Sequence, residues 1–256
     1  MPTTATWSTD LQALLEAAGQ AAKAAGTALI MFIDELQYVE EEQLASLITA
    51  LHRCAQQQVP VMLVGAGLPQ LPGQMGRAKS YAERLFDFPF VGPLDAASAR
   101  EALEVPAQEL GVAYAPQATQ RIIEATEGYP YFLQEWGKHA WDVATVSPIT
   151  AENVAIASTE ATAALDESFF RVRFDRLTPS EKRYLRAMAE LGAGPHRSGD
   201  IANVLGRKVT ALGPTRNHLI SKGMVWSPSH GDTAFTVPMF DAFMRRIMPG
   251  DDWLNS

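Results

Sequence analysis

Residues 28–35, which read ALIMFIDE, carry the strongest local signal in the sequence. Six consecutive side chains, Ala28–Ile33, are apolar, and the run stops at two carboxylates, Asp34 and Glu35. An apolar residue at every position, rather than at every second one, is typical of a strand that is covered on both faces in a parallel sheet. Because open α/β sheets bind ligands beyond the carboxyl ends of their strands, the two acids are predicted to lie at a ligand-binding edge.

The segments around this strand extend the α/β pattern. Amphipathic helices are predicted before and after it, over Thr9–Ala25 and Glu41–Gln57. A second buried strand is predicted over Val59–Val64, followed by Gly65, Ala66 and Gly67. The order helix, strand, helix, strand implies right-handed crossovers and parallel strands. The segment Phe86–Leu94 is predicted to add a third short strand.

The composition is that of a soluble globular protein. The chain has 256 residues, of which 47% are hydrophobic and 20% charged, enough for one or two domains. A single cysteine, Cys54, excludes an internal disulfide and a multi-thiolate zinc site, and the five histidines share no metal-ligand spacing. The apolar runs are too short to cross a bilayer, and the N-terminus lacks the pattern of a secretory signal. We therefore expect a cytoplasmic protein with no membrane partner.

The middle of the chain has a helical pattern. Helices are predicted, with prolines or Gly128-Tyr129-Pro130 between them, over Ala97–Glu104, Ala115–Glu127, Phe132–Val143 and Thr150–Ala164. Pro106 is expected to end the first of these helices. An aromatic and basic connector, SFFRVRF at 168–174, follows the last one.

The C-terminal block opens with a helix-start signal. Thr178, Pro179 and Glu181 make a capping box with proline at the first helical position. The helix is predicted to run to Leu191. Two further helices are predicted over Ser198–Leu205 and Pro214–Lys222. The two strands of a hairpin are predicted over Met224–Trp226 and Ala234–Val237. Three helices and a hairpin predict a winged helix–turn–helix.

The charge is distributed unevenly along the chain. The net charge is −8, but residues 177–248 contain ten Lys and Arg against five Asp and Glu, so this block carries +5 and the remainder −13. A basic segment on an acidic body favours a local anionic partner such as double-stranded DNA. The predicted DNA contacts are the polar and basic residues in and before the second helix of the pair, namely Arg207, Lys208, Arg216, Asn217, His218 and Lys222. The alternative is a winged helix used for protein contact or autoinhibition, with these side chains merely solvated.

Several motifs together carry a family resemblance. IMFIDE resembles the Walker B strand of AAA+ ATPases, although a strand that simply ends in solvated acids is the alternative. Val61–Gly67 stands where such proteins have their sensor-1 strand, and SYAERLFDFPFVGPL, residues 80–94, resembles the box that carries an arginine finger. Gly128–Gly137 resembles the lid of AAA+ and STAND ATPases. With a winged helix after the lid, almost the entire chain is similar to the C-terminal part of a bacterial ATP-binding protein of the replication-initiator, origin-recognition-like branch.

The resemblance implies roles for individual residues. Asp34 would hold Mg²⁺, Glu35 would activate the attacking water, and Arg84 would be the finger that acts on a neighbouring subunit. Gly128, Tyr129 and Pro130 would lie near the adenine of ATP, so the implied cofactors of the intact protein are ATP and Mg²⁺. Two features depart from the family pattern: Gly65-Ala66-Gly67 has no polar sensor side chain, and Gly128–Gly137 contains no arginine.

A phosphate-binding loop is the missing part. The nearest string is GQMGRAKS, residues 73–80, but Ala78 replaces the last glycine, and the string follows the acidic strand instead of preceding it. We interpret it as a chance match. The chain therefore resembles the product of a split or truncated gene, or an expressed fragment, that lacks the N-terminal P-loop. We expect it to bind ATP only weakly, to be inactive by itself, and to self-associate or pair with the missing segment through its open strand edges.

The sequence thus predicts an α/β plus α protein in three parts. These are a partial AAA+ core over residues 1–95, a helical lid and linker over 96–176, and a winged-helix domain over 177–256. The predicted function is that of an ATP-binding, ATPase-type protein with a DNA- or partner-binding domain. The alternative is a non-enzymatic winged-helix module on a degenerate ATPase scaffold.

Overall fold

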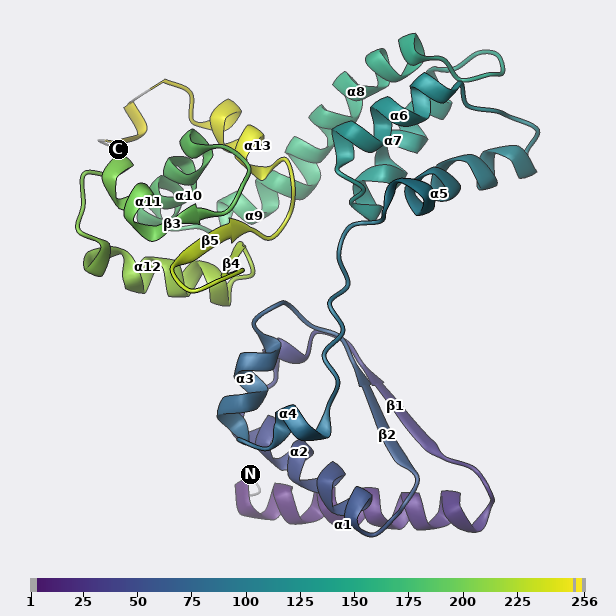
Figure 1. The fold of residues 1–256 in the computed structure, drawn as a ribbon, viewed down its shortest axis with the longest axis vertical. Helices are drawn as coiled ribbons and strands as arrows, with labels where there is room; N and C mark the ends of the chain where they lie inside the picture. Colours follow the sequence, from purple (N-terminus) through teal and green to yellow (C-terminus); the bar gives the residue numbers. More distant parts are fainter. Residues whose placement is uncertain (1–3, 251, 255–256) are drawn as a thin grey trace. The chain divides into compact units, whose positions relative to one another are not determined.

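The computed structural model describes residues 4–250 and 252–254, and it divides the chain into two compact units, Met1–Phe90 and Val91–Ser256. The first is the purple to blue part of Figure 1 and the second the teal to yellow part. The predicted boundaries at 95/96 and 176/177 stay predictions.

The first unit is built around two parallel strands. Its helices and strands, in chain order, are α1 (Thr4–Ala24), β1 (Leu29–Ile33), the 3₁₀ turn η1 (Leu36–Tyr38), α2 (Glu41–Gln56), β2 (Val61–Gly65), α3 (Leu71–Ala78) and α4 (Ala82–Leu85). β1 pairs with β2 in parallel, with Leu29 opposite Val61 and Ile33 opposite Gly65. The parallel pairing of the two predicted strands is confirmed.

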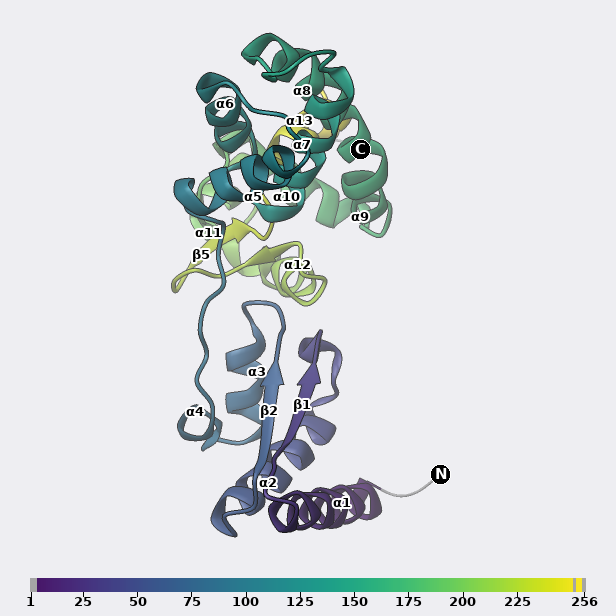
Figure 2. The ribbon, with the colours of Figure 1, turned by 90° about the vertical axis from the view of Figure 1, so that its right-hand side faces the viewer.

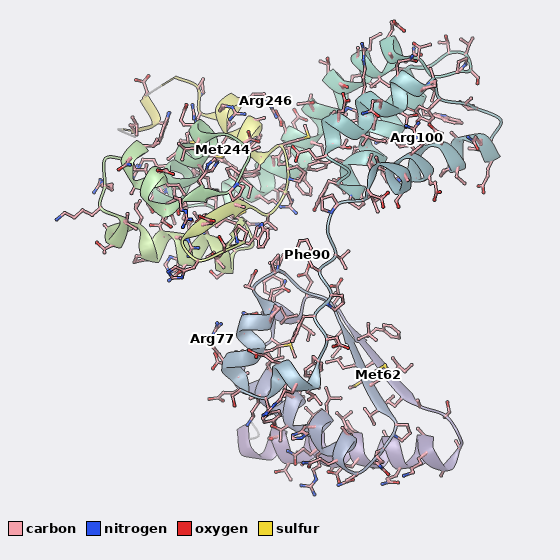
Figure 3. The ribbon with its side chains drawn as sticks, viewed as in Figure 1. Met62, Arg77, Phe90, Arg100, Met244 and Arg246 are labelled. Carbon is pink, nitrogen blue, oxygen red and sulfur yellow. The ribbon has the colours of Figure 1, made fainter. Side chains whose placement is uncertain are left out.

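Only one face of this sheet is covered by the described residues. The covered side chains pack on the buried residues of α1 and α2, and they are Leu29, Met31, Ile33, Val61 and Leu63. The opposite face exposes Ile30, Phe32, Met62 and Val64, and Figure 3 shows Met62 on the side of the sheet away from α3. The prediction of a strand buried on both faces is therefore wrong for this structure, because both strands alternate between half-buried and exposed side chains.

The predicted third strand over Phe86–Leu94 does not form. The segment has no helix or strand assignment, and Phe90 and Val91 are exposed. A strand needs a neighbouring strand to receive its backbone hydrogen bonds, and the only sheet partners in the first unit's described residues are β1 and β2.

The first half of the second unit is helical. Its elements are α5 (Ala96–Glu109), α6 (Pro116–Thr126), α7 (Pro130–Val143), α8 (Ala151–Leu165), the π-helical turn η2 (Asp166–Phe170) and α9 (Arg171–Asp175). Fully buried Phe132, Trp136 and Phe170 belong to its core. Pro106 was predicted to end a helix, which is wrong, because α5 continues through it to Glu109.

The second half combines helices with a small antiparallel sheet. Its elements are α10 (Pro179–Leu191), β3 (His196–Arg197), α11 (Ser198–Val204), α12 (Val209–Ser221), β4 (Val225–Trp226), β5 (Asp232–Phe235), α13 (Phe240–Ile247) and η3 (Asp252–Leu254). The strands pair in the order β3-β5-β4, and Figure 2 shows β5 beside α12 and α11. The predicted capping box is confirmed, because the Thr178 side chain accepts from the Glu181 N–H and the Glu181 carboxylate accepts from the Thr178 N–H. α12 begins at Val209, five residues earlier than predicted, with Pro214 inside it.

The described residues contain neither a membrane-spanning helix nor a clustered set of metal ligands. Within 4–250 and 252–254, no helix combines the length and apolarity needed to cross a membrane. The same residues contain no group of three or more His, Cys, Asp and Glu side chains placed to hold a metal ion. Cys54 is fully buried on α2, where it packs as a small core residue.

Candidate functional site

The two acids lie directly after β1, at the carboxyl end of the parallel sheet. Asp34 and Glu35 are both exposed, and Asp34 Oδ1 accepts a hydrogen bond from the Glu35 N–H at 2.8 Å. Glu35 adopts a left-handed backbone conformation with φ of 55°, which is uncommon for a residue with a side chain. This turn separates the two carboxylates from the strand and leaves both accessible to solvent.

Gln37 holds the second acid in place. Its amide nitrogen donates to Glu35 Oε2, and its amide oxygen accepts from the backbone N–H of Leu68 at 3.0 Å. Gln37 is buried, with 8% of its surface exposed. One side chain therefore ties the residue after β1 to the segment after β2. Sequence reasoning missed Gln37, and the only signal was a polar residue two positions after the acids.

Gly65 ends β2 and Gly67 lies just after it, and both are close to neighbouring side chains. A Cβ on Gly67 would lie 2.8 Å from Gln37 Oε1, and one on Gly65 would lie 2.3 Å from Leu36 Cδ1. Backbone bonds join the same corner, since the Ala66 N–H donates to Ile33 O and the Leu36 N–H donates to Ala66 O. This corner presents glycine and alanine where the resembled family has a polar sensor side chain.

The string at residues 73–80 does not form a phosphate loop. Residues 73–78 lie in α3, where backbone N–H groups donate within the helix, as Gln74 N–H does to Gln70 O. A phosphate cradle needs several free N–H groups that point at one anion. The interpretation of this string as a chance match is supported by its helical structure.

Arg84 lies in the first unit on the short helix α4. Its side chain is exposed and forms no ion pair with the residues that the structure describes. Its role as an arginine finger stays a prediction.

The predicted adenine contacts lie in the second unit and have packing roles there. Gly128 has a φ of 71°, and a Cβ on it would lie 2.3 Å from Leu94 O. Its carbonyl accepts from the Leu94 N–H at 2.9 Å. Pro130 opens α7, and the ring of Tyr129 packs on Phe132 with centroids 4.7 Å apart. Burial raises the pKa of Tyr129, although the charge of Arg173 acts in the opposite direction.

Two of the six predicted DNA contacts are used inside the fold. Arg216 donates to Thr233 Oγ1 and Ser227 Oγ, both at 2.8 Å, and to Asp232 O at 2.9 Å, so it holds α12 against the β4–β5 hairpin. Lys222 donates to Glu181 Oε2 at 2.7 Å and thereby joins α12 to the capping box of α10.

The other four predicted contacts are exposed. Arg207 and Lys208 lie between α11 and α12, and Asn217 and His218 lie on α12. Arg197, which the sequence prediction did not include, is also exposed and pairs with Asp232 at 3.1 Å next to the hairpin. Predicting this position of Arg197 from sequence would have required knowing that β3 pairs with β5.

Comparisons with known proteins support the fold of the chain. A family described as a domain of unknown function, DUF8462, matches residues 167–244. No curated protein matches the sequence. The structure is similar to that of a Walker-type ATPase, PABY2304 of Pyrococcus abyssi, with a TM-score of 0.65, 15% identity, and coverage of 96% of this chain and 68% of that one. A weaker likeness, with a TM-score of 0.46 and 18% identity, relates 95% of this chain to 76% of the Thermotoga maritima RuvB Holliday junction branch migration motor.

The likeness to the Walker-type ATPase shows a shared fold. The chain is a mixed helical protein with a small parallel sheet, and its fold is similar to that of this ATPase. The acids Asp34 and Glu35 stand at the carboxyl end of that sheet.

Proposed function

We propose that this chain is part of an ATPase-type protein of the AAA+ kind, and that Asp34 and Glu35 are its ion-binding and water-activating carboxylates. The observation that carries this proposal is the position of the acid pair. It follows a parallel strand in a chain whose fold is similar to that of a Walker-type ATPase. The carboxyl ends of parallel strands are where α/β folds bind their ligands.

The two carboxylates fit a divalent ion and a polarised water. Carboxylate oxygens are the ligands that Mg²⁺ prefers, and Mg²⁺ keeps several waters when only one or two carboxylates hold it. Asp34 Oδ2 accepts from no described residue, and we assign this oxygen to the ion. Glu35 is oriented by Gln37, as a base that positions a water must be. Arg84 is the residue we assign to a neighbouring subunit's nucleotide.

The described residues do not fit the phosphates of ATP. Residues 4–250 and 252–254 contain no free glycine-rich loop followed by Lys and Ser or Thr, since the one similar string is helical. The chain by itself therefore binds ATP weakly. We propose that a phosphate-binding segment pairs with the open edges of the β1–β2 sheet and covers the face that carries Phe32 and Met62.

The acid pair is tested on the protein as it occurs in its cells. We would tag the chain at its native locus, purify it with whatever accompanies it, and measure ATP hydrolysis. Asp34→Asn and Glu35→Gln should each lower the rate by about 10²–10⁴-fold. Asp87→Asn removes the same charge from an exposed position of the same unit and should leave the rate unchanged.

Hydrolysis at the wild-type rate in both acid variants would overturn this assignment. Tight ATP binding by the purified chain alone in calorimetry would contradict the separate claim that the chain by itself binds ATP weakly. If no hydrolysis accompanies the native protein, the second candidate is favoured, a non-enzymatic module on a degenerate ATPase scaffold. The absence of a polar side chain in Gly65-Ala66-Gly67 is the observation that supports this candidate.

We also propose that residues 177–256 form a winged helix that binds double-stranded DNA. The order of α10, α11, α12 and the β4–β5 hairpin supports a winged helix, with α12 as the recognition helix. The exposed side chains Arg207, Lys208, Asn217 and His218 are the contacts, because Arg and Lys bind phosphates and Asn reads adenine. Arg216 and Lys222 instead keep α12 in place.

Duplex binding is tested by fluorescence anisotropy over a range of salt. The double variant Arg207→Ala with Lys208→Ala should weaken binding and reduce the salt slope by about 2, since each lost phosphate contact removes about 1. The matched control is Arg171→Ala with Lys138→Ala, which removes the same charge from exposed positions elsewhere in the unit. Equal slopes for the two double variants would contradict the proposal, and so would an absence of binding at low salt.

A further inference from the structure

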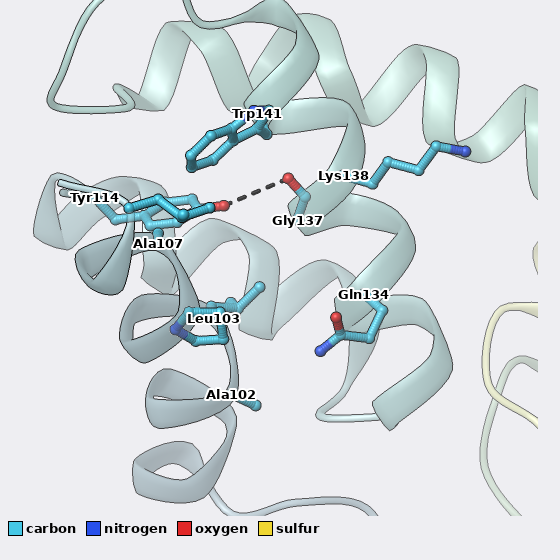
Figure 4. Close-up of a pocket in the computed structure, with 10 residues that line it drawn as sticks. Ala102, Leu103, Ala107, Tyr114, Gln134, Gly137, Lys138 and Trp141 are labelled. Carbon is cyan, nitrogen blue, oxygen red and sulfur yellow. Dashed lines mark hydrogen bonds between the residues drawn. The ribbon is translucent and has the colours of Figure 1, made fainter. Parts of the chain in front are cut away.

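The helical half of the second unit contains two adjoining hollows. One, of about 220 Å³, lies between α5 and α7, and the other, of about 230 Å³, lies beside the C-terminal end of α7. Trp141 lines both hollows, and Figure 4 shows its indole ring above the first. We call the two hollows together the Trp141 groove.

Large apolar side chains are exposed along this groove. Leu110 lines the first hollow and Val146 the second, and each exposes 73% of its surface. Trp141, between them, exposes 39%. Contiguous apolar patches that are exposed on a protein surface often mark interaction sites. Tryptophan is also enriched in protein–protein interfaces relative to the rest of the surface.

The size of the hollows selects the kind of occupant. Pockets for drug-sized ligands measure about 300–1,000 Å³, whereas a cavity of about 150 Å³ holds benzene. Each hollow therefore has room for one ring or one branched side chain. Two such hollows that share the Trp141 ring fit two neighbouring anchor side chains of one polypeptide segment better than they fit one small molecule.

The first hollow is formed before any ligand arrives. The Tyr114 hydroxyl donates to Gly137 O at 3.4 Å, as the dashed line in Figure 4 marks. Gly137 permits a close approach of α7 to α5, since a Cβ there would lie 3.2 Å from Leu103 Cδ2. The ordinary pKa of tyrosine, about 10, already keeps this hydroxyl protonated at neutral pH, and burial raises the pKa of Tyr114 further. A preformed site avoids the entropic cost of ordering its walls upon binding.

The lining of the groove carries one charge, and it is basic. Lys138 is the one charged side chain among the residues that line either hollow. It is exposed and forms no ion pair with the part of the chain that the structure describes. In Figure 4 its amino group extends outward from the hollow, so a complementary group would lie at the rim and not inside.

We propose that the Trp141 groove binds a segment of a partner protein that carries two apolar anchor side chains flanked by acidic residues. The anchors enter the hollows on the two sides of Trp141. An acidic side chain of the segment pairs with Lys138. This site is separate from the acid pair and from the exposed basic residues of α12, so it does not depend on the functions proposed for them.

The test uses the full chain and two pools of fluorescein-labelled twelve-residue peptides. Both pools carry Leu or Phe at positions i and i+4, one with three Glu residues beside them and the other with three Lys residues. Anisotropy titrations should show saturable binding of the acidic pool and at least tenfold weaker binding of the basic pool. Lys138→Glu should reverse this preference, whereas the charge reversal Arg171→Glu, outside the groove, should not.

Two variants test the hollows themselves. Trp141→Ala removes the shared wall and should weaken binding of the acidic pool at least tenfold. Ala102→Trp keeps every native wall and fills the first hollow from α5, so it should have the same effect even if Trp141→Ala disturbs the fold, which circular dichroism would reveal. The proposal is overturned if the acidic pool shows no saturable binding below about 1 mM, if both pools bind equally, or if Ala102→Trp binds like the wild type. It is also overturned if Trp141→Ala changes only the oligomeric state of the chain.

Discussion

Lys222 shows how the role of a single residue depends on its contacts. Its amino group donates to Arg176 O at 3.0 Å and to Glu181 Oε2 at 2.7 Å, and the Glu181 side chain is only 3% exposed. Burial by itself raises the pKa of Glu181, but the hydrogen bonds from Lys222 and from the Thr178 N–H outweigh it, so the pKa lies below its ordinary value. A basic side chain that the sequence suggested for DNA thus stabilises the start of α10.

The first prediction concerns this ion pair. Lys222→Met should lower the free energy of unfolding by about 2 kcal/mol at pH 7, less than for a fully buried pair because Lys222 is 37% exposed. Because the folded pKa of Glu181 is depressed, the stabilisation is present above the unfolded value of about 4.3 and is lost as the pH falls through the folded value. Urea denaturation at pH 7 and pH 3 should therefore show the difference from wild type shrinking at pH 3. Lys208→Met, at an exposed position, should leave the free energy of unfolding unchanged at both pH values. If Lys222→Met lowers the free energy of unfolding by the same amount at pH 7 and pH 3, this account of the ion pair is wrong.

The second prediction compares two glycines with left-handed backbones. Gly128 has a φ of 71° and no room for a Cβ, whereas Gly111 has a φ of 75° and nothing within 4 Å of a Cβ. Gly111→Ala should cost about 1–2 kcal/mol through backbone strain alone. Gly128→Ala should cost at least about 2 kcal/mol more, because its Cβ meets the carbonyl of Leu94. Thermal denaturation measures both. Equal losses would show that Gly128 is not needed for packing and would favour the ligand role suggested by the resemblance.

At the scale of elements, the β1–β2 sheet has one covered and one open face. Neighbouring residues on β1 belong to opposite faces, since Met31 packs on the α1–α2 side and Phe32 is 78% exposed. Open strand edges beside exposed apolar side chains favour association with another strand or another copy of the chain. The alternation makes it possible to separate association from stability by changing adjacent residues.

The third prediction uses this pair of neighbours. Phe32→Ser should reduce concentration-dependent association in sedimentation velocity without lowering the free energy of unfolding, because the side chain makes little contact within the unit. Met31→Ser should lower the free energy of unfolding by about 2 kcal/mol, because it removes a packed side chain from one covered face. If Phe32→Ser destabilises the chain as much as Met31→Ser, the face is covered in solution by residues of the same molecule.

The success of sequence reasoning also differed between elements. Apolar periodicity placed β1, β2 and α2 to within two residues, since these signals are local. Pro106 and Pro214 were read as helix boundaries but lie inside α5 and α12, because tertiary packing outweighs the loss of one helical hydrogen bond. The segment 86–94 has the composition of a strand but lacks a partner strand, which no local pattern reveals.

In the candidate site, too, sequence patterns identified residues but not the contacts between distant segments. Asp34 and Glu35 were found because an abrupt change from apolar to acidic residues is visible in sequence. Gln37 was missed because its role depends on Leu68, which is distant in sequence. The basic side chains of α12 were identified by type, but only their contacts separate Arg216, which holds the hairpin, from the exposed His218.

At the scale of the whole molecule, the chain consists of two compact units joined at Phe90 and Val91. Residues 86–93 have no regular structure, and Val91 is 91% exposed. The second unit begins to be ordered at Leu94, whose N–H donates to Gly128 O. An exposed, irregular connection between separately packed cores is the usual sign that domains fold on their own.

The last prediction follows from this division. Chymotrypsin at low ratio should cut first after Phe90, because Phe90 is exposed in an irregular segment. In the same segment, the bond after Phe88 precedes proline and Phe86 packs on the core of the first unit. Calorimetry of the uncut chain should show two transitions, since each unit has its own hydrophobic clusters. Met31→Ser should lower only the transition of residues 1–90, and Gly128→Ala only that of residues 91–256. A single transition shifted by both variants would mean that the units unfold as one. In that case the stabilities of the two units would be coupled despite the exposed linker. The nucleotide and DNA functions proposed for the units would then have to be tested together.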